Sequence, residues 1–168
     1  MAGTITINFT TFMGGLPVEA IDRICQTYSD IRIRIPCSES LVPLETANAQ
    51  VSVRFGAQTQ NPDDMVQELC MLETARYASP TYIAHHGILK TAADYSKHFF
   101  AGPLKDHFSA PAIQWLRATV SSDYILLDCT GPEIVAQSVY KGPTICALPI
   151  QTVPNHTGMV EVVHSRRE

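Results

Sequence analysis

The stretch Thr4-Ile-Thr-Ile-Asn-Phe9 alternates polar with apolar side chains, a pattern typical of a β-strand with one covered face. From Leu16 the apolar residues recur three and four positions apart, and Pro17 suits a first helical turn, so a helix is predicted to about Tyr28. The run Ile31-Arg-Ile-Arg-Ile35 alternates again and predicts a second strand. A strand, a helix and a strand in this order indicate a β-α-β unit with parallel strands.

Strand and helix patterns continue to alternate along the rest of the chain. Further strands are predicted at Gln50–Phe55, Leu69–Ala78, His98–Ala101, Tyr124–Asp128, Thr144–Leu148 and Met159–Val163. Helical patterns occur at Val42–Ala49, Thr81–His86, from Thr91 and at Pro132–Tyr140, while Ala112–Ala118 fits a short helix or an extended segment. This alternation predicts an α/β fold with mostly parallel sheets.

Length and composition exclude several classes of protein. The chain has 168 residues, enough for one domain or two small lobes, and 45% of them are hydrophobic, so it is expected to fold. Its net charge of −4 is too small to hold nucleic acid or an anionic membrane by charge alone. The start shows neither a basic segment nor an apolar leader, and no apolar run approaches the ~20 residues of a membrane span. We therefore expect a cytoplasmic protein.

No motif of the sequence indicates enzyme chemistry. The five cysteines are widely spaced without a CxxC pair, which indicates reduced thiols, and we interpret them as small buried hydrophobic residues. The six histidines lack metal-ligand spacing, and no GxSxG or glycine-rich phosphate loop is present, so no metal and no cofactor are predicted. A small α/β enzyme that uses Cys129 or a histidine remains an alternative.

Polar residues follow three of the predicted strands. Thr10 and Thr11 follow the first strand, Ser38 follows the second, and Cys129 and Thr130 follow the strand that ends at Asp128. One interpretation is that these residues are ordinary helix caps and turns. The other is that they bind a small molecule, because ligands of α/β folds bind beyond the carboxyl ends of the strands and at helix N-termini.

The arginines on the predicted strands differ in what they indicate. Arg32 and Arg34 share one side of their strand, and we interpret that side as a solvated face. Arg54 follows apolar positions and precedes Phe55. It fits equally a solvent-facing residue and a cation that reaches into a cleft.

Several segments, taken in order, resemble the effector-binding domain of LysR-type transcriptional regulators. The opening strand and helix are similar to that domain's first strand and first helix, and Tyr28-Ser-Asp-Ile31 resembles its Tyr-Pro-Asp-Ile phrase. Four further segments resemble family phrases over nearly the whole remaining chain: Gln50-Val-Ser-Val-Arg-Phe-Gly56, Ala78-Ser-Pro-Thr-Tyr-Ile-Ala84 with His86-Gly87, Thr91-Ala-Ala-Asp94 with His98, and Lys141-Gly-Pro-Thr-Ile-Cys-Ala-Leu-Pro149. The chain departs from the family pattern at Ser29, Gln50 and Pro143.

The resemblance implies two Rossmann-like lobes of the periplasmic-binding-protein type, joined by two crossover strands near Glu73–Ala78 and Ala147–Thr152. The first lobe would comprise residues 1–74 and 153–168, and the second residues 75–152. An inducer would bind in the cleft between the lobes. By the family pattern, the residues that line this cleft are Thr10, Thr11, Ser38, Arg54, Phe100, Ala101, Cys129 and Thr130.

The function implied by the resemblance is that of an inducer-sensing regulatory domain, which binds a small metabolite, often an organic anion, to control transcription. The resemblance also implies a homodimer or higher oligomer, for which the helix from Leu16 and the strand Ile31–Ile35 are the candidate interface. DNA would be contacted only through a winged helix-turn-helix domain, which is not expected in this chain. The chain also ends where the family usually adds a strand and a closing helix, so it is expected to be either an excised piece or a natural truncation. The alternative is a stand-alone solute-binding protein of the same fold.

Overall fold

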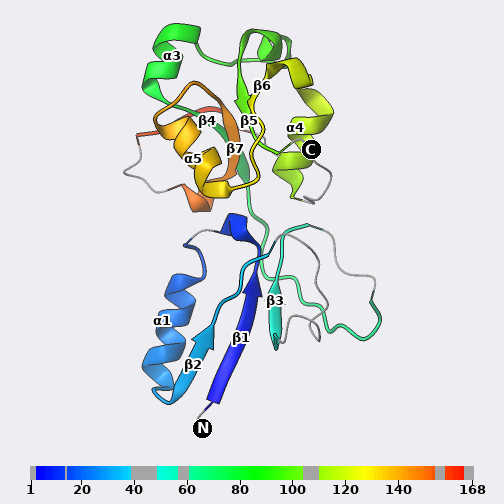
Figure 1. The fold of residues 1–168 in the computed structure, drawn as a ribbon, viewed down its shortest axis with the longest axis vertical. Helices are drawn as coiled ribbons and strands as arrows, with labels where there is room; N and C mark the ends of the chain where they lie inside the picture. Colours follow the sequence, from blue (N-terminus) through cyan, green and yellow to red (C-terminus); the bar gives the residue numbers. More distant parts are fainter. Residues whose placement is uncertain are drawn as a thin grey trace. The chain divides into compact units, whose positions relative to one another are not determined.

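Strand β1 (Gly3–Phe9) lies at the centre of a three-stranded parallel sheet with the order β2-β1-β3 (Figure 1). It pairs on one side with β2 (Ile31–Arg34) and on the other with β3 (Val51–Val53). The structure is a computed structural model that describes residues 3–13, 15–38, 49–56, 61–103, 110–153 and 158–164. The sheet belongs to the first of two compact units, Met1–Phe55, and the second unit is Gly56–Glu168.

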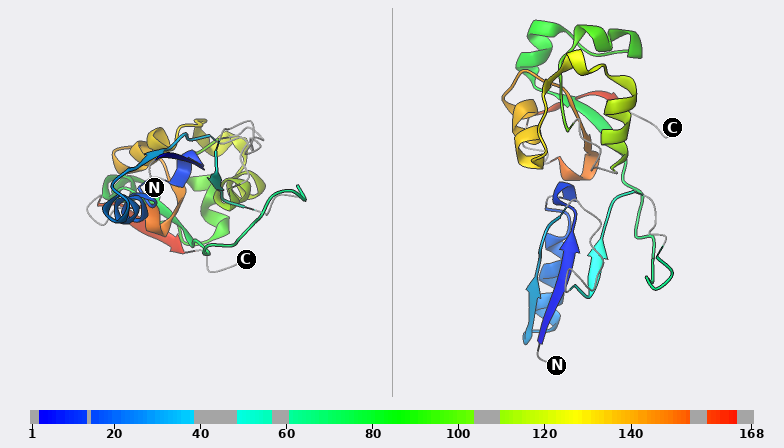
Figure 2. Two further views of the ribbon diagram at one scale, coloured as in Figure 1. Left: turned by 90° about the horizontal axis from the view of Figure 1, so that it is seen from below. Right: turned by 45° about the vertical axis from the view of Figure 1, so that its right-hand side comes forward.

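The first unit contains the predicted β-α-β arrangement. A short 3-10 helix, η1 (Thr11–Met13), follows β1, and α1 (Val18–Thr27) then leads to β2. Figure 2 shows α1 running alongside these two strands. In the β1–β2 register Ile5 lies opposite Ile33, so that apolar side chains alternate on both strands as the sequence predicts. No residue of α1 is buried.

The described residues of the second unit form two sheets and three α-helices. Strand β4 (Thr74–Ala78) is the centre of an antiparallel sheet with the order β7-β4-β8, and β5 (Phe100–Ala101) pairs in parallel with β6 (Ile125–Leu127). The other elements of the unit are α3 (Pro80–His86), η2 (Ala92–Lys97), α4 (Pro111–Thr119), η3 (Ser122–Tyr124), α5 (Pro132–Tyr140), β7 (Cys146–Pro149), η4 (Ile150–Thr152) and β8 (Val160–His164).

The hydrophobic core of the second unit draws on almost all of these elements. Its buried members are Ala78, Tyr82, Leu89, Phe100, Leu116, Val120 and Ile145. An isolated bridge between Phe100 and Ile145 connects β5 to the chain just before β7, so both sheets contribute to one core. The two segments predicted as crossovers lie side by side, because Thr74 of β4 pairs with Pro149 of β7.

Three secondary-structure expectations differ from the structure or fall outside it. The strand predicted over Leu69–Ala78 is shorter, because the ladder with β7 begins only at Thr74, and Leu69 and Met71 are exposed. The cysteines were expected to be buried, but only Cys146 is; Cys25, Cys37 and Cys70 are exposed. The helix predicted at Val42–Ala49 falls on residues 42–48, which lie outside the described residues.

The expected lobe boundaries differ from the grouping of the chain into its units. The residues 153–168 were assigned to the first lobe, yet β8, which lies in this segment, pairs with β4 in the second unit. Alternation of side chains identified a strand at this position, but a period of two carries no information about the partner strand. The boundaries at residues 74 and 152 therefore stay a prediction about the lobes.

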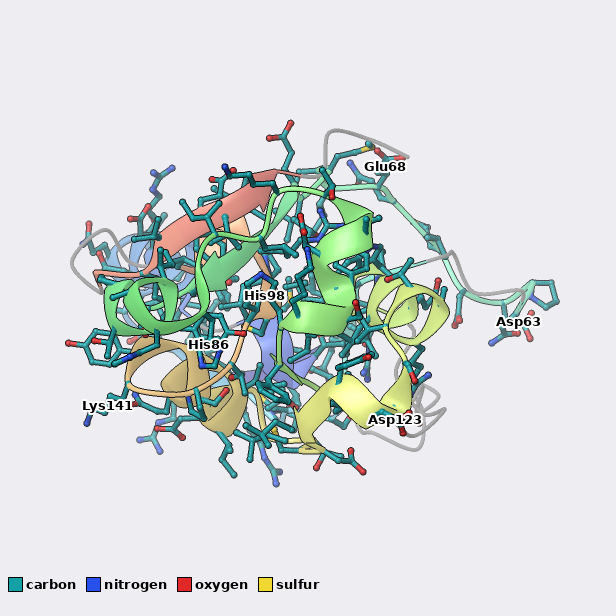
Figure 3. All side chains as sticks on the ribbon, turned by 90° about the horizontal axis from the view of Figure 1, so that it is seen from above. Asp63, Glu68, His86, His98, Asp123 and Lys141 are labelled. Carbon is teal, nitrogen blue, oxygen red and sulfur yellow. The ribbon has the colours of Figure 1, made fainter. Side chains whose placement is uncertain are left out.

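Two buried residues, Tyr82 of α3 and His98, connect α3 to the residues that precede β5. The Tyr82 hydroxyl is 3.2 Å from His98 Nδ1 and accepts a hydrogen bond of 2.9 Å from the Phe99 main-chain nitrogen. His86 stacks on the Tyr82 ring, with centroids 4.5 Å apart, and both histidines are labelled in Figure 3. Burial lowers the pKa of His98 below its ordinary value, an effect that nearby Asp94 opposes.

We expect this histidine to make the protein less stable in mild acid. The unfolded chain binds a proton at the ordinary histidine pKa of about 6.5, whereas folded His98 resists protonation. Stability is therefore highest above about pH 6.5 and falls as the pH drops from there through the lower pKa of the folded state. Thermal unfolding between about pH 7 and 5 should show a smaller loss of Tm in His98→Gln than in the parent. The exposed control His85→Gln should behave like the parent, and an unchanged slope in His98→Gln would contradict the assignment.

Candidate functional site

Main-chain hydrogen bonds bring three of the predicted site residues to one edge of the first unit. The Phe9 nitrogen donates to the Pro36 carbonyl (3.1 Å), and the Ser38 nitrogen donates to the Phe9 carbonyl (3.0 Å). On the other side of β1, the Thr10 nitrogen donates to the Val53 carbonyl (3.4 Å). Because all three strands are parallel, the residues that follow them share the edge where α/β folds bind ligands.

Arg54 extends across this edge and is half-buried. Its Nη1 donates to the Ser38 carbonyl (2.6 Å), and its Nη2 donates to Asn8 Oδ1 (2.8 Å) and Ser38 Oγ (3.2 Å). Its Nε donates to Ser52 Oγ (2.8 Å). Of the two interpretations left open by the sequence, this geometry matches a cation held over the strand ends by oxygen atoms from all three strand segments. We name the group Asn8, Ser38, Ser52 and Arg54 the arginine cluster.

The hydroxyl of Thr10 is buried, and Thr10 follows Asn8 of the arginine cluster by two positions in the sequence. Its side chain is 8% exposed, and its Oγ1 has no hydrogen-bond partner. Buried polar atoms in native structures nearly always have a partner, so this hydroxyl is an exception among the described residues. Thr11, in η1, is exposed.

Sequence reasoning missed two members of the arginine cluster, Asn8 and Ser52. Asn8 lies on the polar side of β1, a side that alternation marks as solvent-facing, yet it is only 3% exposed. Ser52 lies opposite Asn8 in the β1–β3 register. The signal that could have found Asn8 is its position, because it is the last polar residue before the strand end.

In the second unit, the other predicted site residues follow the parallel pair β5 and β6. Cys129 is half-buried and Thr130 is exposed, and both come after β6. Thr130 does not cap α5, whose N-cap is Gly131 with no side-chain hydrogen bond. Phe100 and Ala101 are fully buried, and Phe100 belongs to the core. The side chains of both residues are therefore enclosed by the unit's own residues.

Cys129 and Cys146 of the second unit are poorly suited to nucleophilic catalysis. Burial, and after it the charge of Asp128, raises the pKa of Cys129. Burial raises the pKa of Cys146 far more strongly. Since the thiolate is the reactive form, neither thiol is activated at neutral pH. Among the described residues, no group of three or more potential ligands could hold a metal ion.

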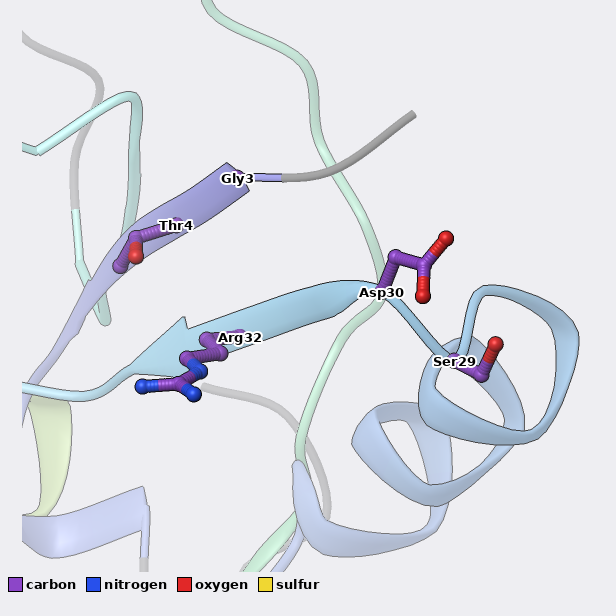
Figure 4. Close-up of a pocket in the computed structure, with 5 residues that line it drawn as sticks. All are labelled: Gly3, Thr4, Ser29, Asp30 and Arg32. Carbon is purple, nitrogen blue, oxygen red and sulfur yellow. The ribbon is translucent and has the colours of Figure 1, made fainter.

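A hollow of about 530 Å³ lies at the opposite end of the first unit's strands. Figure 4 shows it between the start of β1 and the turn before β2, with Asp30 and Arg32 among its lining residues. Gly3 and Ser29 complete this open surface, and Arg32 is exposed as the sequence predicts for a solvated face. The amino ends of parallel strands are not where α/β folds bind ligands, so we keep the arginine cluster as the candidate site.

The strand edge of the first unit carries a guanidinium and a buried hydroxyl, the kinds of group that bind a carboxylate. None of the helices in the described ranges is long and apolar enough to cross a membrane.

Comparison with known proteins identifies the fold. No family profile and no curated protein matches the sequence. Among solved structures, the regulatory domain of CrgA, a LysR-type transcriptional regulator from Neisseria meningitidis, superposes with a TM-score of 0.77 at 17% identity, over 96% of this chain and 81% of that one. Full-length CrgA gives 0.79 at 18% identity, over 99% of this chain and 59% of that one. The effector-binding domain of AmpR from Citrobacter freundii gives 0.66 at 16% identity, over 96% and 84%.

The chain therefore has the α/β fold of LysR-type regulatory domains, which is of the periplasmic-binding-protein type. The predicted fold class is confirmed. The neighbours are domains of transcriptional regulators and not enzymes.

We expect the arginine cluster to stabilise the first unit. Asn8→Ala removes the acceptor of the Arg54 Nη2 and Ser38 Oγ hydrogen bonds, and a partly buried hydrogen bond of this kind contributes about 0.5–1.5 kcal/mol. Urea unfolding should show this loss, whereas Thr4→Ala, at an exposed polar position of the same strand, should change stability by less than about 0.5 kcal/mol. Equal effects of the two substitutions would contradict the role of Asn8.

Proposed function

We propose that the chain is the inducer-sensing regulatory domain of a LysR-type transcriptional regulator, acting in the cytoplasm. The observation that supports this most directly is the edge formed by Thr10 and the arginine cluster, at the strand ends where the fold binds ligands. The fold shared with CrgA and AmpR regulatory domains supports the same proposal. In a whole regulator, DNA would be contacted by a separate winged helix-turn-helix domain.

The proposed ligand is a small organic anion. Arg54 supplies a permanent positive charge, because a guanidinium keeps its proton in proteins, and Thr10 Oγ1 supplies a hydroxyl that has no other partner. A carboxylate at this edge would accept a hydrogen bond from Thr10 Oγ1 and would be attracted by the charge of Arg54. Thr11 and Ser38 border the same edge, and Ala101 of β5 together with Cys129 and Thr130 after β6 would contribute from the second lobe in the proposed cleft.

The proposed mechanism is a change of population and not a reaction. A ligand shifts the balance between two conformations only by the difference in its affinity for them. A molecule that engages donors of both lobes binds better when the lobes are positioned around it. Because of this difference in affinity, inducer binding would favour one arrangement of the lobes, and the rest of a regulator would respond to that arrangement.

The proposed partner is a second copy of the chain. Helix α1 carries Val18 at 60% exposure, and Ile21 and Ile24 are only half-buried, so the helix has an apolar face that its own unit leaves uncovered. Ile35, just after β2, is also exposed. Burying such a face in a symmetric dimer would release water from it, which is the main favourable term in association.

The ligand proposal predicts that loss of the Thr10 hydroxyl weakens ligand binding without lowering the stability of the free protein. Thr10→Val keeps the β-branched shape and removes an unpartnered polar atom, so the Tm of the free protein should stay equal or rise. A panel of small carboxylates, aromatic acids and amino acids should contain a member that raises the parent's Tm, since a ligand specific to the folded state stabilises it. That rise should be lost in Thr10→Val and retained in Thr4→Val. A panel without effect, or an equal rise in Thr10→Val, would contradict the proposal.

The dimer proposal predicts that charge on the apolar face of α1 dissociates the copies. Val18→Glu places a carboxylate in the proposed interface, where burial of an unpaired charge is costly. Arg23→Glu introduces the same residue at an exposed position of the same helix and should leave the assembly intact. Sedimentation velocity would show a dimer for the parent and for Arg23→Glu, and a monomer for Val18→Glu. A parent that sediments as a monomer at all concentrations would exclude this interface.

A further inference from the structure

The second unit contains a buried arginine that the proposed effector site does not use. Arg76 lies in the middle of β4 and is 7% exposed. Its partners in the sheet register are Ala147 of β7 and Val163 of β8, neither of which can carry a charge. Its position within an apolar sheet is unusual, because arginine is almost never fully buried unless it is paired.

Trp115 of α4 fixes the orientation of the Arg76 guanidinium. The Cζ atom lies 3.9 Å from the centroid of the indole ring, which is the geometry of a cation–π contact. The indole is itself held by ring contacts with Tyr95 (5.6 Å) and Phe100 (6.4 Å). The indole ring offers the guanidinium no hydrogen-bond acceptor, so this contact leaves the buried Nε without a hydrogen bond.

The charge of Arg76 is not compensated by any described carboxylate. None of the described residues forms an ion pair with it, and its buried Nε has no hydrogen-bond acceptor. The guanidinium cannot lose its proton to relieve this, so the positive charge persists inside the unit. Buried polar atoms nearly always have a hydrogen-bond partner, so the Nε of Arg76 is an exception that calls for an explanation.

We propose that Arg76 and Trp115 form a second binding site, for a small oxyanion, within the second unit. The guanidinium would bind the oxyanion in its own plane through parallel N–H···O hydrogen bonds, as arginine binds carboxylates and phosphates. Trp115 positions the guanidinium in advance, so that little side-chain freedom is lost on binding. A planar carboxylate fits this geometry best, and inorganic phosphate presents the same chemistry.

Trp115 is the chain's one tryptophan, so its fluorescence reports directly on this site. The full chain is titrated with sodium acetate and, separately, with sodium phosphate, against sodium chloride at equal ionic strength. We expect a saturable change of fluorescence with acetate or phosphate that chloride does not produce. The change should be absent in Arg76→Met. In Arg76→Lys, which keeps the charge and loses the planar donors, the apparent Kd should rise about tenfold or more.

Two controls separate this site from the arginine cluster and from general charge effects. Arg34→Met removes an exposed cation from β2, and Arg54→Met removes the cation of the proposed effector site. Both variants should keep the fluorescence response.

Arg76→Met should remain folded by circular dichroism with an equal or higher Tm, because it removes an uncompensated buried charge. If Arg76→Met fails to fold, the weakened Kd of Arg76→Lys decides the question. A parent without a saturable response, or an Arg76→Lys response equal to the parent's, would overturn the second site and leave the proposed function untouched.

Discussion

The parallel pairing of β1 with both of its neighbours is the constraint on which the candidate site depends. Parallel strands end at the same edge, and the main-chain bonds of Phe9 and Thr10 extend the pairing beyond β1 on both sides. Ser38 and Arg54 are thereby brought together although 16 positions separate them in the sequence. An antiparallel arrangement would place the ends of neighbouring strands at opposite edges, and no such cluster could form.

Much of this arrangement could be predicted from the sequence because it rests on local periodicity. Alternation identified β1 and β2, the helical period identified α1, and the positions after the strands singled out Thr10 and Ser38, whereas Arg54 was named through the family resemblance. Such patterns report which side of an element is apolar, and the parallel β-α-β connection then fixes where the strand ends lie. The overall fold could also be assigned, because the family resemblance extends over nearly the whole chain and the solved structures agree with it.

What could not be predicted depends on contacts between distant segments. Asn8 lies on the polar side of its strand, and alternation alone cannot distinguish a polar residue in solvent from one buried under an arginine. The pairing of β8 with β4, and the end of the β4 ladder at Thr74, are likewise set by the partner strand and not by the strand's own residues. The exposure of Cys25 has the same origin, because α1 has no buried residue although its apolar residues recur at helical spacing.

Arg54 and Arg76 show how differently one residue type behaves in the two units. Arg54 is half-buried and donates to oxygen atoms of Asn8, Ser38 and Ser52, so much of its desolvation is offset by hydrogen bonds. Arg76 is more deeply buried, contacts an aromatic face and has an Nε with no acceptor. Cation–π contact offsets only part of the lost hydration, because a ring face offers no oxygen to the N–H groups. This cost in stability is the reason for the proposed bound partner, since an apolar side chain at the same position of β4 would not carry it.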